Sequence, residues 1–98
     1  MVTIKLNNDN ELEYTIINYN RNITLENGAL QSTGYVHIIN KNLDDLTLLL
    51  DTTITSIQLK IDNEVALNLQ NISAKVNSIN ESLSGDRIII NVNMEFNI

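Results

Sequence analysis

The last residues of the chain alternate between apolar and polar side chains. From Ile88 to Ile98 every even position is apolar, and the odd positions are polar except Ile89. A period of two is typical of a strand with one buried and one solvated face. At about 3.3 Å per residue this strand would reach roughly 36 Å, the width of a globule of this length. We therefore expect the sheet to be organised around it.

The same alternation recurs in earlier segments, which are separated by clusters of Asn, Asp and Gly. Strands are predicted at Val2–Leu6, Leu12–Ile16, Tyr35–Ile39, Ile57–Ile61, Val65–Leu69 and Ile72–Val76, and Ile23-Thr24-Leu25 can form a further short one. Turns are predicted at Asn7–Asn10, Asn18–Asn22, Asn27-Gly28 and Asp62-Asn63, and at Ser84-Gly85-Asp86 within the returning segment Asn80–Asp86. The alternation changes register near Gln70-Asn71, which predicts a bend or a bulge there.

One segment has helical rather than strand periodicity. Leu43, Leu46 and Leu50 recur at helical spacing, Asn42 suits the N-cap, and Asp44-Asp45 lie where carboxylates favour the helix dipole. We predict a helix from Leu43 to Leu50, with only Asp44, Asp45 and Thr47 clearly facing water. The predicted fold is α+β, mainly β: an antiparallel sheet of about six to seven strands with one short helix packed on it, in a single domain spanning residues 1–98.

Composition limits the classes of partner. Twelve acidic residues against six basic ones give a net charge of −6, which works against binding to nucleic acid or to anionic membranes. An acidic protein can still dock on a basic protein. The chain has no cysteine, which excludes disulfides and thiolate metal sites. Its start lacks the apolar region of a signal peptide, and Leu48–Leu50, the longest apolar run, is too short to span a membrane.

Few residues are candidates for chemistry. His37 is the only histidine, and a catalytic or metal site built on it would need carboxylates from elsewhere in the fold. The adjacent pair Asp44-Asp45 is more simply explained as dipole partners than as metal ligands. The loop Asn7–Glu11 offers oxygen ligands but lacks the spacing of an EF-hand. We expect no enzymatic activity, no cofactor and no catalytic, cofactor-binding or metal-binding residues.

The sheet itself is the remaining candidate for function. The segment Ile88–Ile98 contains neither proline nor lysine, two residues that protect an edge strand from pairing with another chain. At an edge of the sheet this strand would promote assembly. The alternative is that neighbouring strands cover it in a central position.

The order of these segments resembles a known group of proteins. The start Ile4-Lys5-Leu6-Asn7-Asn8, a strand near Tyr35–Ile39, the acidic helix Leu43-Asp44-Asp45-Leu46, the hairpin Ile57–Leu69 and the alternating C-terminal strand carry the likeness. The chain resembles small structural proteins encoded in the tail and baseplate region of phages and prophages of low-GC Gram-positive bacteria. The resemblance implies a location in the virion or in the bacterial host cytoplasm, but it transfers no functional residues.

These observations lead to two functional hypotheses and a third alternative. The first is a non-enzymatic structural or assembly protein of a phage or phage-like particle, a homo-oligomer or part of a larger assembly that contacts other protein subunits. The second is a small acidic phage-encoded inhibitor that binds a host defence protein. An enzyme is the third, and it would require a pocket that joins His37 to acidic groups.

Overall fold

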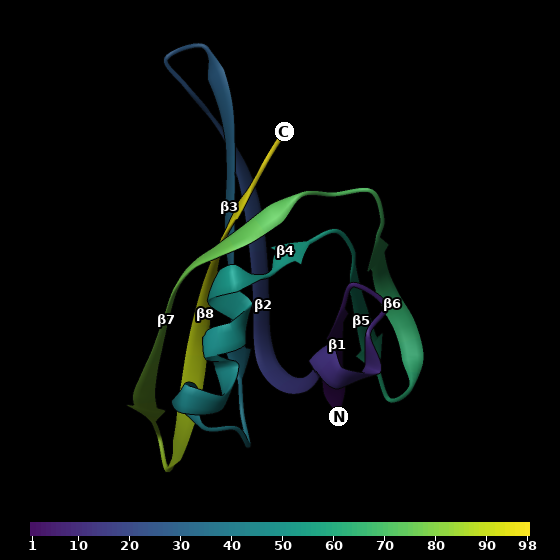
Figure 1. The fold of residues 1–98 in the computed structure, drawn as a ribbon, viewed down its shortest axis with the longest axis vertical. Helices are drawn as coiled ribbons and strands as arrows, with labels where there is room; N and C mark the ends of the chain where they lie inside the picture. Colours follow the sequence, from purple (N-terminus) through teal and green to yellow (C-terminus); the bar gives the residue numbers. More distant parts are fainter.

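The computed structural model describes Met1 to Ile98, and most of these residues lie in one antiparallel sheet (Figure 1). The strands are β1 (Val2–Leu6), β2 (Glu13–Glu26), β3 (Ala29–Ile38), β4 (Thr53–Ile54), β5 (Ile57–Ile61), β6 (Glu64–Leu69), β7 (Ala74–Ser84) and β8 (Arg87–Phe96). Two helical segments interrupt them, η1 (Asn10–Leu12) and η2 (Leu43–Asp51). The predicted fold class is confirmed, with eight strands instead of six to seven.

The C-terminal strand lies inside the sheet. The strand order is β4-β7-β8-β3-β2-β1-β5-β6, so β8 has neighbours on both sides. It pairs with β3 from Ile90 to Phe96 and with β7 along its whole length. The prediction of a long terminal strand that organises the sheet is confirmed. Of the two positions that the sequence left open, the central one is correct, because β8 is hydrogen-bonded to β7 and, from Ile90 to Phe96, to β3.

The core joins strands from both halves of the strand order. A cluster of 17 buried residues includes Ile4 of β1 and Ile57 of β5 as well as Ile90 and Val92 of β8. Since β3 and β2 separate these strands within the sheet, they share a core only because the sheet curls. Figure 1 shows β1, β5 and β6 grouped on one side of β2, and β3, β8 and β7 on the other.

Asparagine, aspartate and glycine make two tight turns of the sheet. Asn27 and Gly28, which join β2 to β3, have φ angles of 51° and 79°. Asp62 and Asn63, which join β5 to β6, have φ angles of 50° and 68°. Positive φ at both central residues defines the type I′ turn, whose twist matches that of a hairpin. Both predicted turns are confirmed.

Strands β2, β3 and β7 are longer than predicted, and in β2 and β7 a bulge interrupts the alternation of buried positions. The register of β2 shifts between Ile16 and Asn18, and that of β7 shifts between Val76 and Ser78. A bulge adds one residue and moves the buried positions from even to odd numbers. The predicted turn Asn18–Asn22 is therefore wrong, since these residues lie within β2. The predicted turn Ser84-Gly85-Asp86 is confirmed at Gly85-Asp86, and β7 continues to Ser84.

The segment predicted as an ordinary helix has 3₁₀ geometry. In η2 Leu46 and Leu49 are buried and Leu43 is half-buried, whereas Leu48 and Leu50 are exposed. A spacing of three fits a 3₁₀ helix, in which residues i and i+3 lie one above the other. The prediction that Leu43, Leu46 and Leu50 share the packed face is thus wrong for Leu50, and Leu49 takes that place. Asn42 occupies the N-cap position but makes no capping hydrogen bond.

Two adjacent leucines near the end of η2, Leu49 and Leu50, differ in how much buried surface their truncation removes. Leu49→Ala deletes a side chain that is fully buried, so we expect a loss of about 2–5 kcal/mol in the free energy of unfolding. Leu50→Ala removes a side chain that is 44% exposed, and we expect less than about 1 kcal/mol. Urea unfolding of both variants measures the difference. If the segment were an α-helix packed through Leu43, Leu46 and Leu50, Leu50→Ala would cost more free energy of unfolding than Leu49→Ala.

Gly34 allows β2 and β3 to approach Phe96 closely. A Cβ atom at this position would lie 2.4 Å from the backbone oxygen of Asn20 and 3.2 Å from the ring of Phe96. We expect Gly34→Ala to destabilise the protein by about 1–3 kcal/mol, because the backbone of β2 must shift. Gly28→Asn is the control, since nothing lies within 4 Å of Gly28 and asparagine tolerates its left-handed conformation. Equal melting temperatures for the two variants would contradict this account.

Candidate protein-binding surface

The β2–β3 hairpin extends past the rest of the sheet. The last pair between β3 and β8 is Ser32 with Phe96, and β1 stops pairing with β2 at Ile16. We call the remainder of the hairpin, residues 22–31, the arm. Figure 1 shows the arm as a dark blue loop that projects beyond the other strands. It is held only by its own hydrogen bonds and by its base.

The arm carries apolar side chains that nothing covers. Ile23 is 55% exposed, Leu25 70% and Leu30 62%. Leu25 is paired with Leu30, and Ile23 with the buried Ser32, so all three lie on the face that is buried further down the sheet. The arm therefore continues the core face into solvent. Exposed apolar groups gathered in this way mark interaction sites more often than scattered ones do.

Packing contacts and a hydrogen bond lie at the base of the arm. The guanidinium of Arg21 lies 4.8 Å from the centre of the Phe96 ring, a cation–π contact. The hydroxyl of Ser32 donates a hydrogen bond of 2.9 Å to the backbone oxygen of Asn22. Burial raises the pKa of the nearby Tyr19 hydroxyl, and Arg21 opposes this shift. The base of the arm is thus packed, while the apolar side chains of its outer part are exposed to solvent.

One edge of β2 has unused backbone hydrogen-bonding groups beyond Ile16. A two-residue turn is closed by a hydrogen-bonded pair, here Glu26 with Ala29, and such pairs alternate along an antiparallel ladder. The even residues of this part of β2 therefore bond to β3. The odd residues point their N–H and C=O groups away from it: Tyr19, Arg21, Ile23 and Leu25. No strand pairs with them in the structure.

The arm is nearly uncharged on a strongly acidic protein. Glu26 is the only charged residue between Asn22 and Gly34. With Arg21 included, the free part of β2 has no net charge, although the whole chain has a net charge of −6. Two copies would therefore meet little electrostatic repulsion at this edge.

Sequence reasoning singled out His37, and the structure places it in the middle of β3. Its partners in the ladder are Asn18 and Asn91, and its ring stacks on Tyr35 with 4.9 Å between centroids. Both ladder neighbours are amides. The carboxylates that an acid–base or metal site would need do not flank His37.

The oxygen-rich loop Asn7–Glu11 is used for structure. The side-chain oxygen of Asn7 accepts a 2.7 Å hydrogen bond from the backbone of Thr55, and its amide donates to the backbone oxygen of Thr53 at 2.9 Å. The carboxylate of Asp9 accepts from the backbone of Glu11 at 2.9 Å. These bonds fix the loop that precedes β5 to the turn after β1. Nowhere in the chain do three or more His, Asp or Glu residues gather as a metal site would need.

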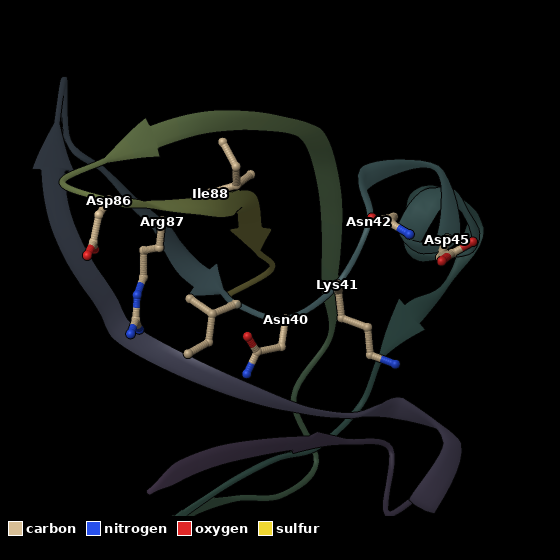
Figure 2. Close-up of a pocket in the computed structure, with 8 residues that line it drawn as sticks. Asn40, Lys41, Asn42, Asp45, Asp86, Arg87 and Ile88 are labelled. Carbon is tan, nitrogen blue, oxygen red and sulfur yellow. The ribbon is translucent and has the colours of Figure 1, made fainter.

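The largest hollow, of about 640 Å³, lies between the loop after β3 and the turn between β7 and β8 (Figure 2). Lys41 and Arg87 supply its positive charges, and Asp45 and Asp86 its negative ones. In Figure 2 the charged ends of Lys41 and Arg87 point in different directions and do not converge on one position. The hollow is open and mixed in charge, so its geometry defines no ligand.

The other free edges of the sheet are weaker candidates. The outermost strands are β4, of two residues, and β6, of six. Leu83 and Ile88 form an exposed apolar pair at the β7–β8 turn, but both lie beside charged residues, Glu81 and Arg87. The arm combines the largest apolar exposure with a neutral edge, so it is the strongest candidate surface. The sequence does not reveal the arm, because the polar residues Asn18–Asn22 match the composition of a turn although they lie within β2.

Comparison with known proteins adds no relative: no protein-family model, no curated protein and no solved structure matches this chain. None of the helical segments has the length and apolar character that crossing a membrane requires. Function is therefore inferred from the surface described above.

The direction of the backbone groups in β2 can be tested by amide hydrogen exchange. In dilute solution we expect fast exchange at Arg21, Ile23 and Leu25, whose N–H groups face solvent, and slower exchange at Asn22 and Thr24, which bond to β3. Residue-resolved NMR measures the rates. Uniform protection along this stretch would show that the edge is already paired.

Proposed function

We propose that this protein is a non-enzymatic structural or assembly protein that acts through protein–protein contacts within a phage or phage-like particle. The observation that carries the proposal is the arm, on which Ile23, Leu25 and Leu30 extend the core face into solvent. The assignment to a phage tail or baseplate rests on the resemblance of the sequence layout.

The energetics of the arm support a binding role. An exposed leucine contributes little to folding, yet full burial of one such side chain stabilises a complex by about 1.5–3 kcal/mol. A hairpin that projects from a packed base can insert into a neighbouring subunit while the sheet stays intact. Its type I′ turn at Asn27-Gly28 fixes the register of the two strands.

A double substitution on the arm separates binding from folding. We expect Leu25→Asn with Leu30→Asn to change the free energy of unfolding by less than about 0.5 kcal/mol per site, because both side chains face water. The same variant should be largely lost from purified particles, as measured by mass spectrometry and electron microscopy.

The matched control is Leu83→Asn, which removes a leucine with the same 70% exposure as Leu25 from the opposite end of the sheet. We expect this variant to enter particles normally. A wild-type protein that stays strictly monomeric and is absent from particles would contradict the proposal.

A second candidate function is that of an acidic inhibitor of a host defence protein. Of twelve acidic residues, only Asp62 and Glu13 are in ion pairs, so most carboxylates remain available to a basic partner. Under this alternative, binding to the host protein should weaken steeply with salt and with Asp44→Asn and Asp45→Asn. Binding that is indifferent to salt would count against it.

A further inference from the structure

We infer that the free edge of β2 takes the same edge of a second copy of this chain, in antiparallel pairing about a two-fold axis at Asn22. This inference rests on the proposed function and names its partner. The free stretch runs from Asn18, just past the bulge, to Glu26, where the turn begins, and Asn22 is its midpoint. In antiparallel orientation about Asn22, the same stretch of a second copy fits between the start of β1 and the tip of the arm.

The backbone groups of the two copies match in this arrangement. The outward-facing residues pair with one another, Tyr19 with Leu25 and Arg21 with Ile23 of the second copy, and each pair occurs twice. Residues in such pairs exchange two hydrogen bonds, so the contact would supply about eight backbone bonds. Asn22, whose backbone groups bond to β3, would lie opposite Asn22 of the second copy at the two-fold axis.

The side chains are compatible with this register. On the apolar face Tyr19 lies opposite a leucine and Arg21 opposite an isoleucine, and on the other face Glu26 lies opposite Asn18. No like charges oppose each other, which is the condition that two acidic copies must satisfy. Moving the axis to Arg21 would place two arginines opposite each other. Moving it to Ile23 would place Tyr19 opposite the turn and lose hydrogen bonds.

The size of the contact sets its strength. One strand edge per copy buries less than the roughly 800 Å² per partner of a standard interface. The free stretch contains neither proline nor lysine to block pairing. We therefore expect a weak dimer, with a dissociation constant on the order of micromolar, which the high local concentration of an assembly would populate.

A single cysteine tests the register, because the chain has none of its own. Opposed residues in a non-hydrogen-bonded pair have Cα atoms about 4.5 Å apart, within the range for a disulfide. We expect Asn22→Cys to form a disulfide-linked dimer under mild oxidation, and Thr24→Cys alone to form little. A mixture of Asn20→Cys and Thr24→Cys should cross-link as a heterodimer, which keeps the test valid if Asn22→Cys folds poorly.

A charge substitution provides an independent readout. Ile23→Lys places a lysine opposite Arg21 of the second copy twice per dimer, and we expect at least about a threefold weaker dimer in analytical ultracentrifugation. Ile23→Glu places a carboxylate there and should dimerise more tightly than the lysine variant. Leu83→Lys is the control for added charge away from β2 and should dimerise as the wild type does.

Two results would overturn the inference: equal cross-linking of Asn22→Cys and Thr24→Cys, or no cross-linking of any variant. If the protein still enters particles in either case, only the two-fold pairing fails and the proposed function stands. If dimers form through Asn22 but the protein is absent from particles, the pairing stands and the proposed function fails.

Discussion

The pairing of β2 with β3 is the constraint on which the other features of the structure depend. Its ladder runs from Ile16 and Ile38 to the turn at Asn27-Gly28, further than β1 on one side or β8 on the other can follow. Together β2 and β3 form the centre of the sheet and supply four of its 17 core residues, Tyr14, Ile16, Val36 and Ile38. The part of the hairpin that extends past its neighbours exposes an apolar face, and the outer edge of β2 there is unpaired. The centre of the sheet and the proposed binding surface thus come from one hairpin that is longer than its neighbours.

The rest of the chain stabilises that hairpin without covering its outer part. The helix η2 packs on β7 through leucines three residues apart, and Asn7 ties the loop before β5 to the turn after β1. At the base of the arm, Gly34 permits the close contact of β2 and β3 with Phe96, over which Arg21 lies. Apolar groups are left exposed where no element crosses the core face, so the exposed leucines of the arm result from the topology.

Much of the fold could be predicted from the sequence, because alternation and turn chemistry are local signals. The hairpin at Asp62-Asn63, the turn at Asn27-Gly28 and the C-terminal strand were predicted for the right physical reasons. The two long strands were not, since a bulge at Ile17 and another near Asn77 shift the buried positions and make a continuous strand resemble two short ones. The arm was missed for the same reason. Its exposure depends on which strands stop short beside it, and a single sequence does not show strand order.

The claim most in need of a direct test is that the free edge of β2 is where copies meet. In antiparallel pairing about Asn22, the α protons of Asn20 and Thr24 of two copies approach closely, whereas within one strand these residues are about 13 Å apart. An isotope-filtered NMR experiment on a mixture of labelled and unlabelled protein detects contacts between copies only. We predict a cross-peak between these two α protons that grows with protein concentration; its absence at millimolar concentration would contradict the account.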